Sequence, residues 1–163
     1  MKLTALQACL LSPLVLLGGD LHAQVPEWLA GTAPENGVFF LPLGYHTQYE
    51  RHATRNDLAG AVYRSVAAGT FINSFDDRSW FLVMIRRVVA TPRFEVEYFA
   101  GVVGGYRGRL QETTGIPFRK SFLWRGDINP VVSLNLGVVL APNLRLQMMV
   151  SPLMTCTGLK YSF

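Results

Sequence analysis

The stretch NPVVSLNLGVVLAPNLRLQMMVSPLMTCTGLKYSF, Asn129 to Phe163, decides the fold. In three short runs, residues at every second position are mainly apolar and those between them are mainly small or polar. Clusters of turn-forming residues separate the runs. We call each set of alternate positions a parity. The mainly apolar parity consists of Val132, Leu134, Leu136, Val138 and Leu140, then Leu144, Leu146, Met148 and Val150, and finally Thr157, Leu159, Tyr161 and Phe163. Successive strand side chains point to opposite faces, so each run predicts a strand with one apolar face. Side chains this bulky would overfill a small lumen, and we therefore expect this face to contact lipid.

The start of the chain resembles a secretory signal peptide. Residues 1–23 combine a charged start at Lys2, an apolar stretch from Ala5 to Leu17 and a cleavage site at Leu21-His22-Ala23. Removing them leaves 140 residues (163 minus 23) and a single cysteine, Cys156, so no intramolecular disulfide is expected. Residues 24–163 are predicted to form one barrel domain. Its leader, 24–36, is either a short interfacial helix or an arm.

No later run of about 18 apolar residues exists, which excludes an ordinary transmembrane helix. In lipid the remaining solution is a closed barrel, because every backbone polar group needs an internal partner. At roughly ten residues a strand plus turns, the mature chain suffices for about eight strands. We predict an all-β, eight-stranded antiparallel transmembrane barrel, monomeric, with both termini periplasmic, in the bacterial outer membrane.

The composition agrees with a membrane protein. Half of the residues are hydrophobic and only 16% are charged, against an average of about a quarter. The net charge is +4. The excess of arginine is suited to anionic lipid headgroups or lipopolysaccharide phosphates, and ordinary interfacial arginines explain it equally well.

Further strands are expected at about 38–45, 58–66, 69–75, 79–87, 94–104 and 129–140, before the last two. A long external loop, Gly105 to Asp127, follows the fifth strand. On the first strand, the parity of Phe39, Leu41, Leu43 and Tyr45 is expected to face lipid, and His46 to face the lumen. On the third, Ser74 shares a parity with Thr70 and Ile72 that we expect to face inward.

The lumen is predicted to be greasy rather than a water channel, because both faces of Ser79 to Arg87 are apolar. Glu95 and Glu97 are expected to point inward on the fifth strand, where Arg86, Arg145 or Lys160 can pair with them in a structural ion network; the alternative is an acid pair for catalysis. Four strand glycines either make room for an acyl chain or relieve curvature in a small barrel. They are Gly101, Gly104, Gly137 and Gly158.

Three residues form the candidate catalytic set. The predicted topology brings His46, Asn73 and Ser74 to the same external rim, where a serine beside a histidine is a possible nucleophile and base. The alternative is that they are polar because rim residues meet water.

Around these residues the sequence resembles the lipid A palmitoyltransferases of the PagP type. The similar pieces are Leu43-Gly44-Tyr45-His46, the charged loop through Tyr49, Glu50, Arg55, Asn56 and Asp57, the segment Phe71-Ile72-Asn73-Ser74-Phe75, and the C-terminal Tyr161-Ser162-Phe163. The resemblance implies transfer of a palmitoyl chain from a phospholipid to lipid A, with a histidine in the first external loop and an Asp-Ser pair in the second. His46 and Ser74 match that histidine and serine.

One departure from the family pattern concerns the aspartate. Asn73 stands in its place, and an amide orients a neighbour but does not stabilise a cation as a carboxylate does. Asp76 or Asp77, just beyond, can supply the missing charge.

Two other functions are considered. A non-enzymatic barrel would bind lipopolysaccharide, a host surface or another protein through the loop Gly105 to Asp127. A lipid A deacylase would need a His-x-Ser motif, which the sequence lacks. No zinc spacing, phosphate-binding loop or nucleotide fingerprint is present, so we expect neither metal, nor soluble cofactor, nor nucleic-acid partner.

Overall fold

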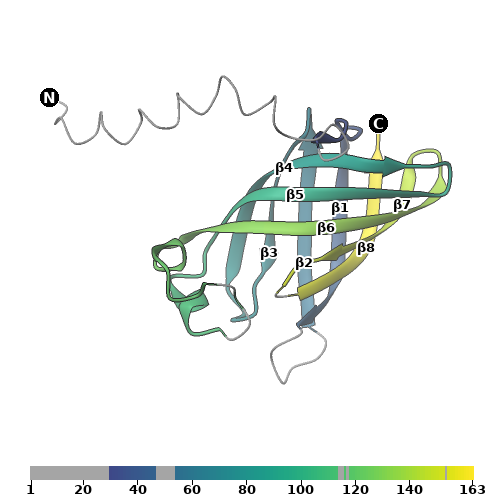
Figure 1. Cartoon of the computed structure of the whole chain (residues 1–163). Coiled ribbons are helices and arrows are strands. Elements are labelled where there is room, and N and C mark those ends of the chain that lie inside the picture. Colours follow the sequence, from purple (N-terminus) through teal and green to yellow (C-terminus); the bar gives the residue numbers. More distant parts are fainter. Residues whose placement is uncertain (1–29, 47–53, 114–115, 117, 153) are drawn as a thin grey trace, which may run out of the picture. The chain divides into compact units, whose positions relative to one another are not determined.

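The computed structural model describes residues 30–46, 54–113, 116, 118–152 and 154–163. Eight antiparallel strands close into a barrel in chain order within the unit Gly31–Phe163 (Figure 1), which confirms the predicted fold class. The strands are β1 (Gly37–His46), β2 (Thr54–Tyr63), β3 (Val66–Ile72), β4 (Arg78–Ala90), β5 (Phe94–Gly104), β6 (Ile128–Ala141), β7 (Leu144–Val150) and β8 (Met154–Ser162). Two short 3-10 turns, η2 (Arg109–Gln111) and η3 (Phe122–Trp124), lie between β5 and β6. No helix among the described residues is long and apolar enough to cross a membrane.

The two ends of the barrel differ in their connections. At the end that we call the turn end, short turns join β2 to β3, β4 to β5 and β6 to β7. At the opposite end, the loop end, the connections are residues 47–53, 73–77, 105–127 and 151–153. Gly37 pairs with Ser162, so β1 begins and β8 ends at the turn end.

Side chains alternate between the lumen and the outer surface as predicted for β5 to β8. On β5, Glu95, Glu97 and Phe99 are buried, whereas Phe94 is 49% exposed. On β6, Leu134 is 53% exposed and both of its strand neighbours are buried. The two-residue period therefore identified the inner and outer faces of this half of the barrel correctly.

On β1 the predicted orientation is wrong for the first half of the strand. Phe39 and Leu41 are buried in the lumen, whereas Leu43 and Tyr45 point outward as predicted. The pairing register of β1 with β8 shifts between Phe40 and Leu43, where Leu41 and Pro42 together stand opposite the single residue Gly158. A bulge reverses the alternation, and it tolerates a proline because the missing N–H is not needed there.

The β2–β3 hairpin lies earlier in the chain than predicted. Its two-residue turn is Arg64-Ser65, with φ of 47° and 71°. Positive φ at both positions characterises the type I′ turn, which matches the twist of paired strands. As a result Phe71 is buried and Thr70 is exposed, so the prediction that the Thr70 parity faces inward is wrong.

Candidate functional site

The loop-end half of the lumen contains an apolar cavity of about 310 Å³. Its wall includes inward side chains from β1 to β5, among them Phe39, Leu58, Phe71, Phe81, Val83 and Phe99. The rings of Phe39 and Phe81 lie 6.0 Å apart, centroid to centroid. This volume is at the lower end of the range for small-molecule sites, and it matches the greasy interior predicted from the fourth strand.

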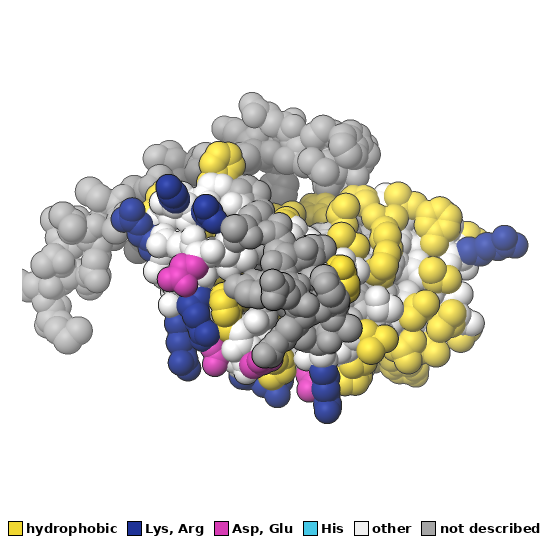
Figure 2. Space-filling model, turned by 90° about the horizontal axis from the view of Figure 1, so that it is seen from below, with side chains coloured by type: hydrophobic (Ala, Val, Ile, Leu, Met, Phe, Trp, Pro, Cys, Tyr) yellow, Lys and Arg dark blue, Asp and Glu magenta, His cyan; other side chains and the backbone are white. Residues whose placement is uncertain are grey.

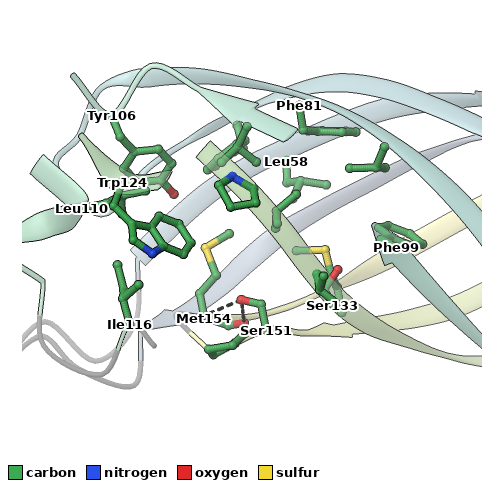
Figure 3. A pocket seen from close by; sticks show the side chains of 18 of the residues that line it. Leu58, Phe81, Phe99, Tyr106, Leu110, Ile116, Trp124, Ser133, Ser151 and Met154 are labelled. Atoms are coloured by element: carbon green, nitrogen blue, oxygen red, sulfur yellow. Dashed lines mark hydrogen bonds between the residues drawn. The ribbon is translucent and has the colours of Figure 1, made fainter. Parts of the chain in front are cut away.

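The cavity ends where the inward side chains of three strands change from mainly apolar to polar. Phe99, Ser133 and Met149 line the cavity, and the next inward residues toward the turn end on the same strands are Glu97, Asn135 and Gln147. Figure 3 shows Phe99 and Ser133 at this deep end. An apolar chain that enters from the loop end would therefore stop at the polar layer.

That layer is an ion network of three acidic and three basic side chains, of which Glu95, Glu97, Arg145 and Lys160 are buried. Lys160 Nζ lies 2.7 Å from Glu97 Oε1 and 3.8 Å from Glu95 Oε1. Arg145 Nε lies 3.2 Å from Glu95 Oε2, and Arg145 Nη2 lies 2.8 Å from Glu35 Oε2. The sixth member, Arg87, lies 3.7 Å from Glu95 Oε2 and 3.9 Å from Glu35 Oε1.

The predicted ion network is thus confirmed for two of its three basic partners. Arg145 and Lys160 pair with the glutamates, whereas Arg86 donates to the carbonyl of Gly31 at 3.1 Å. A neutral side chain also belongs to this layer: Asn135 Nδ2 donates to Glu97 Oε2 at 2.9 Å. Buried charges need such partners, and here the pairing closes the lumen toward the turn end.

The loop between β5 and β6, residues 105–127, covers the other end of the cavity. Six of its residues line the cavity: Tyr106, Leu110, Ile116, Phe118, Leu123 and Trp124. Figure 3 shows the four that it labels, Tyr106, Leu110, Ile116 and Trp124, together opposite the deep end. The ring of Tyr106 lies 6.2 Å from that of Phe71, and burial raises the pKa of its phenol above the usual value. The phenol therefore stays protonated at physiological pH.

Two polar anchors hold this loop on the barrel. The Asp127 carboxylate accepts hydrogen bonds from the backbone N–H of Gly105 at 3.1 Å and of Arg107 at 3.0 Å. Arg109 forms an ion pair with Asp77 of the β3–β4 connection and lies 4.6 Å above the Phe75 ring. The loop is consequently part of the site rather than a free arm.

The cavity reaches the outer surface at the seam between β6 and β7. The loop-end pair of that ladder is Leu134 with Val150, so in the described chain residues 128–133 of β6 pair with β5 but not with β7. Both sides of this gap line the cavity, Pro130–Ser133 on one and Ser151 and Pro152 on the other. Val132 is 64% exposed and lines the cavity as well, which shows a lateral opening in the barrel wall.

The strand glycines do not supply the room in the cavity, since none of the four considered lines it. A Cβ on Gly101 or Gly158 would lie 2.3 or 2.0 Å from a backbone oxygen of the neighbouring strand. A Cβ on Gly137 would lie 2.7 Å from Glu95 Cγ. These glycines allow close strand approach and, at Gly137, make space for the ion network.

The candidate catalytic residues lie at one end of the barrel, as predicted. His46 ends β1, where its backbone pairs with Met154, and Ser74 follows the end of β3. The side chain of His46 lies outside the described part of the structure. Ser74 is half-buried in the 73–77 turn and does not line the cavity. The pairing of a nucleophile with a base remains a prediction.

Asn73 organises the turn at the end of β3. It is 2% exposed, and its Oδ1 accepts from the backbone N–H of Phe75 at 2.8 Å and of Asp77 at 3.2 Å. Its Nδ2 donates to Ser79 Oγ at 2.9 Å. Because both ends of this amide are engaged, the geometry favours a structural role. Asp77 pairs with Arg109, and Asp76 is exposed in the turn.

We expect Asn73→Ala to lower the free energy of unfolding by about 1–3 kcal/mol, because it leaves buried donors and acceptors without partners. Urea unfolding of the refolded barrel in detergent measures this. Asn143→Ala, at an exposed turn position, is the control and should change stability by less than about 0.5 kcal/mol. Loss of function in an Asn73→Ala protein of unchanged stability would instead assign Asn73 to catalysis.

Sequence reasoning missed the cover and the lateral opening. Tyr106, Leu110, Ile116 and Trp124 are spaced apolar residues in a loop that was considered only for external binding. Their spacing was the available signal. Cys156 is buried, and Asn56 Nδ2 donates to its Sγ at 2.9 Å.

Fold and site together define a small closed barrel with a covered apolar cavity, a charged floor and a side opening. Compared with known protein families and with curated proteins, the chain matches none of them. Within the described residues no group of three or more His, Cys, Asp or Glu side chains is placed to hold a metal ion.

Proposed function

We propose that this protein is an outer-membrane acyltransferase that moves a long acyl chain from a phospholipid to lipid A. The observation that carries the proposal is the apolar cavity with a polar floor and an opening through the barrel wall. Such a cavity suits one flexible apolar chain, because its wall has few polar groups for a chain to desolvate. A side opening suits a substrate that arrives within a lipid layer.

The outer surface supports a membrane location. Large hydrophobic side chains that are at least a third exposed occur on all eight strands, for example Phe40, Leu82, Leu134 and Leu159. Figure 2 shows hydrophobic side chains over the barrel wall and basic ones gathered toward the end formed by the 105–127 loop, at the left. A continuous apolar surface of this extent is costly in water and suited to lipid.

The proposed chemistry uses Ser74 and His46 at the loop end. Ser74 Oγ attacks the ester carbonyl of the phospholipid while His46 accepts its proton, and the lysophospholipid hydroxyl leaves with that proton. A lipid A hydroxyl then attacks the acyl-serine, and the serine recovers its proton through His46. Each half-reaction forms one ester and breaks one, so no further reactant is required.

The test is expression of the full chain in a Gram-negative host, followed by mass spectrometry of its lipid A. We expect a species heavier by one long acyl chain. As a matched variant, Ser133→Trp would fill the deep end of the cavity while preserving the rim residues, and it should shorten the transferred chain or abolish transfer. Wild-type protein that folds in the outer membrane and leaves lipid A unchanged would refute the enzymatic proposal.

The second candidate is a barrel that binds a lipid chain without chemistry. It is favoured by the position of Ser74, which does not line the cavity. Under this proposal, purified protein would retain an amphiphile from the membrane, and lipid A would keep its mass.

A further inference from the structure

The loop that covers the cavity has a second face, which is basic and aromatic. In sequence, residues 105–127 contain five basic residues and two acidic ones, a net charge of +3 within a chain of net charge +4. Of the two acidic residues, Asp127 is bound to backbone N–H groups of the loop. This loop therefore concentrates the positive charge of the protein at the mouth of the cavity.

This face has a hollow that is lined by Ile116, Phe118, Arg119, Lys120 and Ser121. Phe118 and Ile116 also line the cavity, so the hollow and the cavity adjoin. A turn builds the hollow, since the N–H of Ser121 donates to the carbonyl of Phe118 at 2.8 Å. Arg119 and Lys120 are the two central residues of that turn.

Three polar side-chain groups of the hollow lack protein partners within the described part of the chain. Neither Arg119 nor Lys120 forms an ion pair with a described carboxylate, in contrast to Arg109, which pairs with Asp77. Ser121 Oγ is buried and has no hydrogen-bond partner there. Two cations and an unused hydroxyl form a donor set suited to the oxygens of a phosphate group.

Phe118 makes the same end of the site suited to lipid. Its φ is 54°, a conformation that bulky residues rarely adopt, and its side chain is 85% exposed. Such conformational outliers are typical of functional positions. Phe122 is 79% exposed nearby in sequence. Exposed aromatic side chains beside cations are typical of surfaces that lie at a lipid headgroup layer.

We propose that the Arg119-Lys120-Ser121 hollow binds the phosphate of an anionic lipid headgroup whose acyl chain occupies the adjoining cavity. The inference rests on the proposed function only for the location of the acyl chain. A phosphate held at residues 119–121 would position a phosphorylated amphiphile across the cavity mouth. The binding surface thereby becomes selective for charge as well as for chain length.

The test uses the purified barrel in dodecyl maltoside, a non-ionic detergent without phosphate. Didecanoyl phosphatidic acid, didecanoyl glycerol and inorganic phosphate are titrated separately, and binding is followed by tryptophan fluorescence. We expect phosphatidic acid to bind at least about tenfold more tightly than the diacylglycerol with the same chains, because charge-assisted hydrogen bonds contribute only to the former. This preference should weaken as salt is added.

Three variants identify the site. Arg119→Gln/Lys120→Gln should abolish the tenfold preference and leave diacylglycerol binding unchanged. Ser121→Ala should lower phosphatidic acid affinity between about two- and tenfold. The matched control, Arg64→Gln/Arg93→Gln, removes the same charge at the turn end and should keep the preference.

The outcomes separate this proposal from the preceding one. Equal binding of both lipids by the wild type, or an unchanged preference in Arg119→Gln/Lys120→Gln, overturns the phosphate site. Displacement of phosphatidic acid by an equal concentration of inorganic phosphate would show that free phosphate is the ligand and would overturn the lipid assignment. If phosphatidic acid binds at this site and diacylglycerol does not bind at all, the phosphate site stands and the acyl cavity fails.

Discussion

Lys160→Met should lower the free energy of unfolding by about 3–5 kcal/mol, which is the usual cost of removing one partner from a buried ion pair. The Lys160 side chain is 2% exposed, and its ammonium group lies between Glu97 and Glu95. Without it, Glu95 keeps Arg87 and Arg145, whereas Glu97 keeps only the neutral amides of Asn135 and Gln147. Urea unfolding of the refolded barrel in detergent, followed by circular dichroism, measures the change.

A second variant isolates the charge effect. Glu97→Gln/Lys160→Met removes one charge of each sign and keeps an acceptor for the Asn135 amide, so it should recover at least half of the lost stability. Arg93→Met, an exposed position at the turn end, serves as the control for loss of a positive charge. A Lys160→Met barrel as stable as the wild type would mean that water reaches the floor and solvates the carboxylates.

Ser74→Ala and His46→Ala should each lower acyl transfer by about 10³-fold, within the range that a nucleophile or general base contributes. The physical reason is that the serine forms the acyl intermediate and the histidine carries its proton in both half-reactions. The measurement is transfer of a labelled chain from phospholipid to lipid A by purified protein in mixed micelles. Unfolding curves that match the wild type would show that the variants remain folded.

His52→Ala is the matched control for His46→Ala, because it removes the histidine that is nearest to His46 in the sequence. Full transfer by Ser74→Ala would exclude the acyl-serine step. Full transfer by His46→Ala would exclude this histidine as the base. Either result would leave the cavity in place and transfer the catalytic role to other residues of the loop end.

The success of sequence reasoning varied along the barrel for a physical reason. From β5 to β8 the inner positions toward the turn end are charged, small or amide residues and the outer ones are apolar, so the two faces were distinguishable. On β1 both parities are apolar, and the bulge at Leu41 and Pro42 reversed the alternation, for which the proline was the available signal. At Arg64-Ser65 the turn lacks the glycine or asparagine that usually indicates a type I′ hairpin.

Some features of the candidate site could be predicted from the sequence and others could not. Antiparallel order alone places the ends of β1 and β3 at one end of the barrel, so the common location of His46 and Ser74 followed from counting strands. The structural role of Asn73 did not follow from counting strands. Its hydrogen-bond partners are backbone groups of the turn and the hydroxyl of Ser79, six residues later. Residue type alone does not distinguish an amide that closes a turn from one that orients a base.

Local pattern determined the all-β class, the strand number and most of the outer surface, because each depends on which face a side chain takes relative to its neighbours in sequence. Tertiary structure alone decided the cavity, its ion-paired floor, its loop cover and its lateral opening. Each of these needs side chains from distant strands in one place: Lys160 meets Glu97 across 63 positions of sequence. Such contacts depend on the closure and the pairing register of the whole barrel, which cannot be predicted from any short stretch of sequence.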